Sequence, residues 1–325
     1  MVPIESGVDK GLAWHYGDPL REQRWLEEGT GVVDLANREV FTITGSERGS
    51  YLNLLGTAKL DGLALGQSTS TFLLDPQGHI LFFLALVETG EEIWGWTELG
   101  CGAGLVDHLT RMKFRMDVDI QLREDMSVVW CGSPEGVCRT GTPNCLGGAE
   151  MFIPHGDVES VMGGGHPVGL WAYTARRIAA GIPRIGVDTD GRTLPNELGV
   201  PSENVTLNKG CYPGQETVAR VYNVGAPPRR LVRLHFDGSE ERFLDPGTPI
   251  TLEGDTVGYL GSMAYHYELG PIGLSLVKRE TDDAAALFAD ALPSRLDPLV
   301  PRDVGLHVRF QPGARIFHPV RPPLK

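Results

Sequence analysis

Residues 209–216 (KGCYPGQE) hold the densest set of side chains that could do chemistry. Pro213 suits the first position of a helix, so we predict a helix over 213–222 with Cys211 just before it. A thiol at that place lies near the positive end of the helix dipole, and Lys209 adds a second positive charge. Both effects favour the thiolate, which makes Cys211 a candidate reactive cysteine tuned by Lys209. The alternative is that Cys211 is a small buried hydrophobic residue.

Basic side chains gather around this segment although the whole chain is acidic. The 325 residues include 29 Lys and Arg against 42 Asp and Glu, a formal net charge of −13. Such a chain is not a non-specific DNA-coating protein. Residues 209–233, however, include five basic residues and only one acidic residue. Arg176 and Arg177 contribute two more positive charges earlier in the chain. This basic band could meet an anionic ligand, or its arginines could be surface charges that pair with acids elsewhere.

The remaining cysteines do not form a metal-binding pattern. Cys131, Cys138 and Cys145 follow a C-x6-C-x6-C spacing, whereas structural zinc prefers C-x2–4-C pairs, so no metal site is expected. The chain has no G-x-x-x-x-G-K-[ST] segment and no G-x-S-x-G segment, which disfavours nucleotide hydrolases and serine hydrolases. An odd cysteine count, no visible secretory signal and no apolar run of membrane-spanning length favour a cytoplasmic protein with reduced thiols.

Hydrophobic periodicity and turn residues divide the chain near residue 226. Before this point we expect four helices in addition to the one over 213–222, and three strand regions; the four helices cover 19–28, 47–55, 103–112 and 170–180, and the strands 31–45, 67–97 and 114–122. After Pro227 and Pro228, short strands with glycine turns predict a small β-barrel or sandwich. An acidic helix is expected over 281–292, and the tail is rich in proline.

The octet 209–216 resembles the signature of the YgfZ family. These are folate-binding proteins related to the T-protein (aminomethyltransferase) of the glycine cleavage system. Residues 33–45 (VDLANREVFTITG) and 177–183 (RIAAGIP) also resemble family elements. The resemblance implies an α+β fold, a three-lobed ring of two ferredoxin-like α+β lobes and a C-terminal β-barrel. Residues 1–226 would form the T-protein-like folate-binding region, and residues 227–325 the barrel domain with its proline-rich tail.

The resemblance implies tetrahydrofolate as the ligand, bound in the central hole of the ring. The family's pterin-stacking positions fall on Tyr173 and on Arg38, which is not aromatic. The family glutamate that hydrogen-bonds the pterin falls on Ala179, and Glu197 is a candidate substitute. The nearby arginines, Arg177 and Arg220 among them, are expected to meet the glutamate tail of folate.

Within the octet, the resemblance assigns the functional thiol to Cys211 and the tuning charge to Lys209. Gly210 and Gly214 are expected to allow close backbone approach, and the other motif positions are Tyr212, Gln215 and Glu216.

An aspartate pair of the T-protein, one member of which is catalytic, falls on Phe82 and Phe83. Classical aminomethyl transfer is therefore not expected. The resemblance instead implies an accessory protein for the maturation or repair of iron–sulfur enzymes, and tRNA modification indirectly through one of them. One alternative is a folate-dependent one-carbon transferase. Another is a scaffold that has lost folate and binds a different anion, a protein partner or tRNA.

Overall fold

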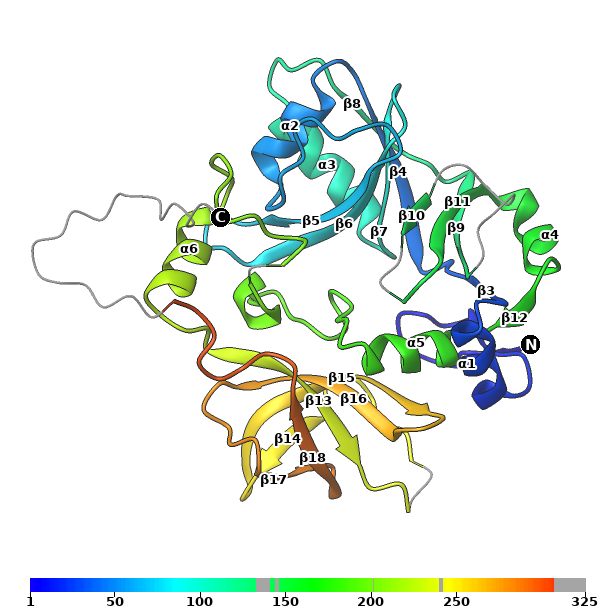
Figure 1. Cartoon of the computed structure of the whole chain (residues 1–325), viewed down its shortest axis with the longest axis vertical. Helices are drawn as coiled ribbons and strands as arrows, with labels where there is room; N and C mark the ends of the chain where they lie inside the picture. The colour runs from blue at the N-terminus through cyan, green and yellow to red at the C-terminus, as the bar shows by residue number, and fades with distance from the viewer. Residues whose placement is uncertain (133–140, 144–145, 201, 240–241, 307–325) are drawn as a thin grey trace, which may run out of the picture.

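The protein is a ring of three lobes, two of mixed α+β structure and one closed β-barrel, as Figure 1 shows. This computed structural model describes residues 1–132, 141–143, 146–200, 202–239 and 242–306. It confirms the α+β class and the C-terminal barrel that the sequence predicts. Within the described ranges, no helix is both long and apolar enough to cross a membrane.

The first lobe is an antiparallel five-stranded sheet packed against two helices. Its strands, in the spatial order β5-β6-β7-β4-β8, are β4 (Arg38–Thr44), β5 (Ser68–Leu74), β6 (Ile80–Glu88), β7 (Ile93–Glu98) and β8 (Asp119–Leu122). The helices are α2 (Arg48–Leu55) and α3 (Gly102–Met112). Successive residues of β6 face two different cores: Leu84 packs toward the helices, whereas Ala85 packs toward the second lobe. A strand buried on both faces is apolar without alternation, which explains the run ILFFLALV.

The second lobe combines the beginning of the chain with its middle. Its sheet has the order β10-β11-β9-β3-β12 and consists of β3 (Gly31–Asp34), β9 (Met126–Cys131), β10 (Gly141–Pro143), β11 (Ala149–Pro154) and β12 (His166–Val168). Its helices are α1 (Pro19–Glu27), α4 (Val158–Met162) and α5 (Leu170–Ala179), and a 3₁₀ turn, η1, covers His155–Asp157.

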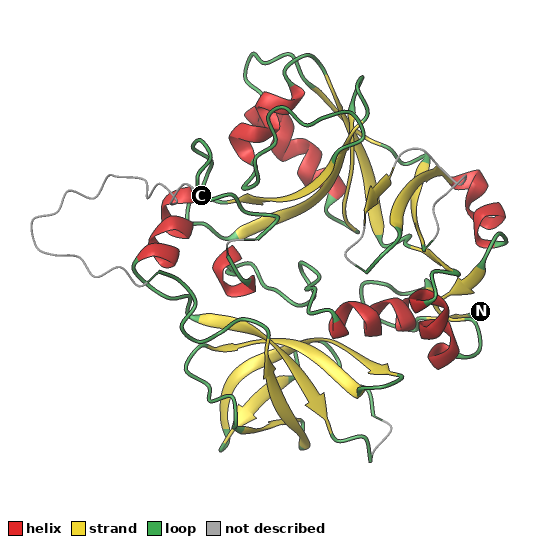
Figure 2. Cartoon of the chain, in the orientation of Figure 1, coloured by secondary structure: helices red, strands yellow, loops and turns green. Residues whose placement is uncertain are grey.

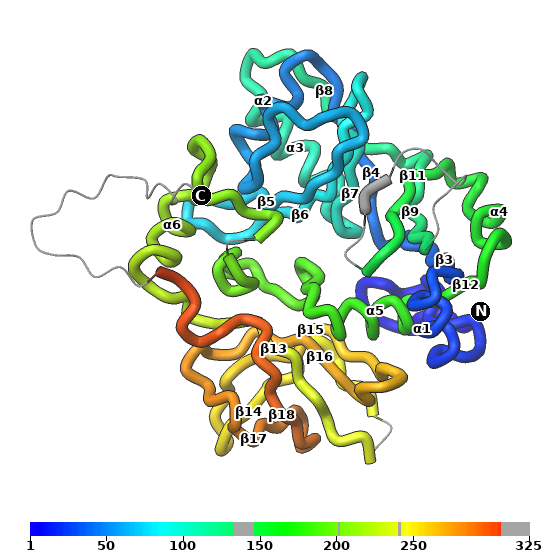
Figure 3. The backbone as a smooth tube through the Cα atoms, viewed as in Figure 1, coloured from blue at the N-terminus to red at the C-terminus, as the bar shows by residue number. Residues whose placement is uncertain are grey.

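The N-terminal strands β1 (Val2–Pro3) and β2 (Ala13–His15) pair with each other, and β2 lies along α5, as the tube in Figure 3 shows. This crossing requires glycine at position 169. A Cβ there would come within 2.2 Å of the Trp14 carbonyl oxygen.

The third lobe is a closed barrel of six strands in the order β13-β16-β15-β14-β17-β18. They are β13 (Arg229–Phe236), β14 (Pro249–Leu252), β15 (Asp255–His266), β16 (Gly270–Lys278), β17 (Ala286–Ala289) and β18 (Leu292–Pro298). In Figure 2 the helices lie on the two α+β lobes and along the segment that leads to the barrel, while the barrel itself is built of strands. Two more elements, η2 (Pro195–Leu198) and α6 (Gln215–Asn223), lie on the segment between α5 and the barrel. Helix α5 packs on β15 and so joins the second lobe to the barrel.

Three expected elements differ from the structure. The acidic helix expected over 281–292 is wrong, because this stretch forms a turn and strand β17. Leu287 and Ala289 are buried while Phe288 is exposed, and this period of two closes the barrel between β14 and β18. The strand expected over 114–122 begins only at Asp119, after a loop in which Phe114 has a positive φ of 48°. Helix α6 begins at Gln215, two residues later than expected.

Candidate functional site

A cavity of about 490 Å³ lies where the two α+β lobes meet the segment that follows α5. Its walls come from β4, β5, β6, β7, β11 and α5, together with residues 182–185 and 203–204. The lining residues are Arg38, Ser68, Thr69, Ser70, Phe72, Phe83, Ala85, Trp96, Glu98, Leu146, Glu150, Tyr173, Arg177, Ile182, Pro183, Arg184, Ile185, Glu203 and Asn204. Its size and its mixture of aromatic and polar walls suit a small-molecule ligand.

Aromatic rings form one part of this wall. The ring centroids of Phe72 and Phe83 lie 5.9 Å apart, and those of Phe83 and Trp96 lie 5.3 Å apart. Tyr173, predicted to stack on a ligand ring, also lines the cavity, and its side chain is buried. Such a wall offers apolar area and π faces to a planar ligand.

A buried carboxylate, that of Glu150, stands next to these rings. One of its oxygens accepts a hydrogen bond of 2.7 Å from the Trp96 indole N–H, and the other accepts one of 2.8 Å from the Tyr173 hydroxyl. The residue is 3 % exposed. Glu150 was not among the predicted site residues, although an acid between apolar neighbours in the strand AEMFIP is a recognisable signal of a buried polar role.

The other cavity carboxylate, Glu98, is held between two arginines. Its Oε2 accepts hydrogen bonds from Arg38 at 2.8 Å and from Arg184 at 2.7 Å. Arg184 also forms an ion pair with Asp9, and the Arg38 guanidinium lies 4.3 Å from the centroid of the Trp96 ring. The structure thus places Arg38 on the cavity wall, where it stacks on an aromatic side chain of the protein itself.

Arg177 lines the cavity too, but its described contacts are within the protein. It donates hydrogen bonds to Asp188 at 2.7 Å, to the Ile182 carbonyl at 2.6 Å and to the Ser262 hydroxyl. This buried ion pair joins α5, the segment after it and barrel strand β15. Its contribution to binding a folate tail remains a prediction.

Two residues predicted to contact the ligand do not line the cavity. Glu197 is fully buried and accepts hydrogen bonds from Arg229 at 2.8 Å and from the Leu194 N–H at 3.0 Å. Arg220 is exposed on α6 and pairs with Glu216 at 3.0 Å. Both are paired within the protein, Glu197 with Arg229 and Arg220 with Glu216 of the same helix, and their contacts with a ligand remain predictions.

The octet lies beside the first lobe and is anchored there by Lys209. The Lys209 ammonium donates hydrogen bonds to the carbonyls of Asn53, Gly56 and Ala58, at 2.8, 2.6 and 2.6 Å. These groups lie at and just beyond the C-terminus of α2, where helix carbonyls lack partners. Burial lowers the pKa of Lys209 to about 8. Tuning of Cys211 by Lys209 remains a prediction.

Of the two glycines in the octet, Gly214 is required by the local geometry and Gly210 is not. Gly214 has a φ of +78°, and a Cβ there would come within 2.7 Å of both the Asp75 carbonyl oxygen and the Gly78 Cα. The expected close backbone approach therefore exists at Gly214. At Gly210 a Cβ would meet nothing within 4 Å.

Cys211 is exposed and lies in the loop before α6 rather than at the first turn of the helix. Next to it, Tyr212 is buried in a cluster that contains Phe72, and Phe83 packs against the same cluster. Gln215 begins α6, and its backbone N–H donates to the Tyr212 carbonyl at 3.2 Å. Tyr212 therefore packs behind the aromatic wall of the cavity while the neighbouring thiol faces outward.

Of the three evenly spaced cysteines, Cys131 is buried in β9, and Cys138 and Cys145 lie outside the described residues. In the part of the chain that the structure describes, no group of three or more His, Cys, Asp or Glu side chains could hold a metal ion.

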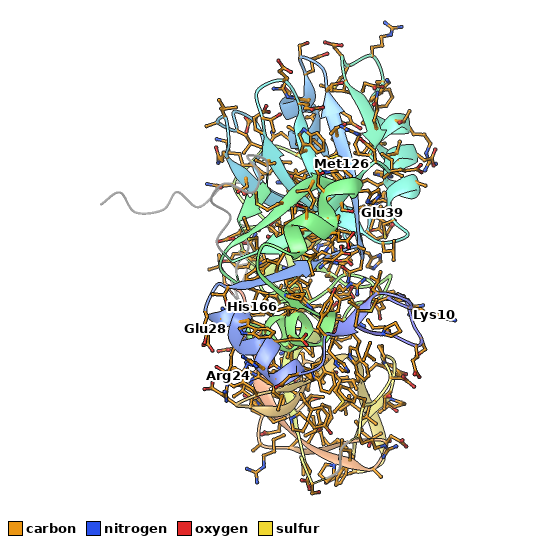
Figure 4. The ribbon with its side chains drawn as sticks, turned by 90° about the vertical axis from the view of Figure 1, so that its right-hand side faces the viewer. Lys10, Arg24, Glu28, Glu39, Met126 and His166 are labelled. Atoms are coloured by element: carbon orange, nitrogen blue, oxygen red, sulfur yellow. The ribbon has the colours of Figure 1, made fainter. Side chains whose placement is uncertain are left out.

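A second hollow, of about 520 Å³, lies along the exposed side of α1. It is lined by Asp18, Leu20, Arg21, Arg24, Trp25 and Glu28. Arg24, Glu28 and His166 lie close together at this edge in Figure 4, and the Trp25 and His166 rings stack with centroids 4.3 Å apart. Two bases and two acids balance each other here, so the hollow carries no marked preference for a charged ligand.

The fold closely matches a solved structure of an aminomethyltransferase. The glycine cleavage system aminomethyltransferase T of Bartonella henselae superposes with a TM-score of 0.74, covering 91 % of this chain and 93 % of that one at 17 % sequence identity. The human mitochondrial iron-sulfur cluster assembly factor IBA57 is 27 % identical over 237 residues, 64 % of each chain. The tRNA-modifying protein YgfZ of Vibrio vulnificus is 32 % identical over 117 residues. The chain is thus similar in sequence to IBA57 and YgfZ proteins, and it has the fold of the T-protein.

The similarity in fold covers more of the chain than the similarity in sequence does. The fold match extends over nearly the whole chain. The sequence matches cover less, about two thirds of the human relative and 32 % of the Vibrio relative. No protein-family model matches the chain.

Proposed function

We propose that this protein binds tetrahydrofolate in the central cavity and supports the assembly or repair of iron–sulfur enzymes, with tRNA modification as an indirect outcome. The observation that carries the proposal is the cavity, where the rings of Phe83, Trp96 and Tyr173 stand beside a buried carboxylate. The pyrimidine ring of a reduced pterin is planar and carries N–H donors, which such a wall complements. The printed names of the human and Vibrio relatives support the iron–sulfur and tRNA parts of the proposal.

The proposal gives Cys211 the role of the functional thiol. Its exposure makes the sulfur accessible to a protein partner or to a cluster under assembly. The partners would be iron–sulfur enzymes or their assembly proteins, and a cytoplasmic location remains a prediction.

The binding part of the proposal is tested by anaerobic calorimetric titration with tetrahydrofolate, with folic acid and glutamate as controls. Two adjacent residues on β6 supply matched variants: Phe83 lines the cavity, whereas Phe82 packs toward α3. We expect wild-type affinity in the micromolar range or tighter, a loss of about tenfold or more in Phe83→Ala from lost ring contact, and little change in Phe82→Ala. No measurable binding by the wild-type protein would exclude the folate part.

A folate-dependent transferase is the alternative function. The family's acid positions are Phe82 and Phe83, and Phe83 forms part of the cavity wall, where a phenyl ring cannot move a proton. We therefore expect no methylenetetrahydrofolate when the protein is supplied with several aminomethyl donors and tetrahydrofolate. Turnover in this assay would establish the transferase reading instead.

A further inference from the structure

The loop between β1 and β2 reaches the wall of the central cavity through one side chain. This loop, residues 4–12, is closed at its base by a hydrogen bond of 2.8 Å from the Ile4 N–H to the Leu12 carbonyl. Both of these residues pack against the core cluster of the second lobe. Residues 5–11 form the tip, which is exposed except for the half-buried Asp9. The tip therefore depends on Asp9 for its attachment to the rest of the protein.

Asp9 forms an ion pair with Arg184, a buried residue that lines the cavity. The bond runs from the Arg184 Nη1 to one Asp9 oxygen. The other oxygen, Oδ1, is buried and has no hydrogen-bond partner in the part of the chain that the structure describes. A buried carboxylate oxygen without a donor is destabilising, because it has lost its water and gained nothing in return. Asp9 is thus an imperfect partner for Arg184.

Arg184 has a second carboxylate partner, Glu98, which is held far more firmly. The Arg184 Nε donates to Glu98 at 2.7 Å, and Arg38 donates to the same Glu98 oxygen at 2.8 Å. Glu98 belongs to β7, a strand that is paired on both sides, with β4 and with β6. Of the two carboxylates at Arg184, Asp9 is therefore the one that can leave.

The charges of this group balance only while Asp9 is in place. The two guanidinium groups of Arg38 and Arg184 are matched by the carboxylates of Glu98 and Asp9. If Asp9 left, one buried positive charge beside the cavity would lack its counterion, which is unfavourable. A carboxylate brought by a ligand would restore the balance, and its contact with a guanidinium is a charge-assisted hydrogen bond.

We infer that Arg184 is the place where the cavity takes up a carboxylate of its ligand, and that Asp9 occupies this place in the free protein as an internal substitute. The inference rests on the proposed function, in which the carboxylate belongs to the glutamate of tetrahydrofolate. Binding exchanges one ion pair for another. The ligand carboxylate accepts from the Arg184 Nη1, the Nε stays with Glu98, and Asp9 returns to water with the tip of its loop.

The first test measures the dissociation constants of two ligands by anaerobic calorimetry. Tetrahydrofolate carries the glutamate, and 6-methyltetrahydropterin has the same ring system without it. We expect Asp9→Asn to bind tetrahydrofolate about 3- to 10-fold more tightly than the wild type does, because the internal competitor is gone, and to bind 6-methyltetrahydropterin within about twofold of the wild type. Glu5→Gln is the matched control. It removes the same charge from an exposed position of the same loop and should change neither constant.

A double variant shows whether Asp9 acts through Arg184. Arg184→Gln should bind tetrahydrofolate more weakly than the wild type does. Adding Asp9→Asn to it should no longer tighten binding, since the group for which the two carboxylates compete is absent. Thermal unfolding reports whether each variant is folded. An equal gain from Asp9→Asn with and without Arg184 would assign the effect to another group and overturn the inference.

Proteolysis of the wild-type protein follows the loop itself and needs no variant. Lys10, next to Asp9, is exposed, and Figure 4 shows it at the edge of the molecule. The rate of trypsin cleavage after Lys10 depends on how often the loop is released from the protein. We expect tetrahydrofolate to raise this rate about twofold or more and 6-methyltetrahydropterin to leave it unchanged.

The outcomes separate this inference from the proposed function. If the wild-type protein binds tetrahydrofolate but Asp9→Asn binds it no more tightly, the exchange does not occur and the inference is overturned while the proposed function stands. The same holds if tetrahydrofolate binds but leaves cleavage after Lys10 unchanged or slower. If the wild-type protein binds neither ligand, the proposed function fails and this inference fails with it.

Discussion

Cys211 illustrates how much a single residue's role depends on what surrounds it. Its thiol is exposed, while its neighbour Tyr212 is buried against the cluster that contains Phe72. Lys209, two positions earlier, is hydrogen-bonded to carbonyls at and just beyond the C-terminus of α2. The loop is therefore held on both sides of the cysteine, and the thiol has a defined position on the surface.

We expect Cys211→Ser and Cys211→Ala to lose function in cells while folding normally, because an exposed side chain contributes little to stability. The measurement is the activity of iron–sulfur enzymes in cells that lack the endogenous relative and carry each variant. Cys101→Ser, at a partly buried cysteine that caps α3, is the matched thiol control and should retain function. Full activity of both Cys211 variants would remove the proposed role of this residue.

The turn before α6 and the turn 75–78 fit together only because glycine occupies two facing positions. Gly214 has a positive φ, and Gly78 has one too. We expect Gly214→Ala to lower the free energy of unfolding by about 1–3 kcal/mol, through the unfavourable φ and the close contact with the Asp75 carbonyl. Gly210→Ala, in open space in the same loop, is the control and should change it by less than about 0.5 kcal/mol. Equal effects in urea unfolding would contradict this account.

The ion pair between Asp190 and Arg229 ties the segment before η2 to barrel strand β13. Hydrogen bonding from Arg229 lowers the pKa of Asp190 to about 2. An acid with a lowered folded-state pKa stabilises the fold above its unfolded pKa near 3.8, and this contribution is lost as the pH falls toward 2. We expect wild-type stability to decline over this window and the decline to be shallower in Asp190→Asn. Urea unfolding at several pH values between 2 and 5 measures the free energy of unfolding of both proteins. The same pH dependence in the wild type and in Asp190→Asn would refute the role of this ion pair.

The three lobes are held in a ring by buried polar contacts as well as by apolar packing. Asp188 accepts hydrogen bonds from Arg177, from the Arg184 N–H and from the Ser262 N–H, at 2.7, 2.7 and 2.6 Å. These donors belong to α5, to the segment after it and to the barrel. The neighbouring Gly261 leaves room for the carboxylate, since a Cβ there would come within 2.3 Å of its oxygen.

We expect Asp188→Ala to lower the free energy of unfolding by about 3–5 kcal/mol, because it leaves the buried Arg177 charge without its carboxylate. The exposed pair of Glu216 and Arg220 provides the comparison, and Glu216→Ala should cost no more than about 1 kcal/mol. Denaturant unfolding measures both. A small effect of Asp188→Ala would mean that apolar packing alone holds α5 to the barrel.

Features that depend on local pattern could be predicted from the sequence. Alternating residues and glycine turns predicted the barrel strands, and the octet 209–216 with its neighbouring segments predicted the YgfZ/T-protein-like fold. Local pattern gave a wrong prediction where pairing with strands distant in the sequence sets the secondary structure. Residues 286–289 suit a helix by composition, yet they form β17 because the barrel needs a strand there.

The polar side chains around the cavity could be identified only from the folded chain. Glu197 and Arg220 were predicted to contact the ligand, but their charges are matched by Arg229 and Glu216 outside the cavity. Glu150 gave no motif, since its partners Trp96 and Tyr173 lie 54 and 23 positions away along the chain. A buried charge takes its role from the groups that fold around it, and one sequence without its fold does not show those groups.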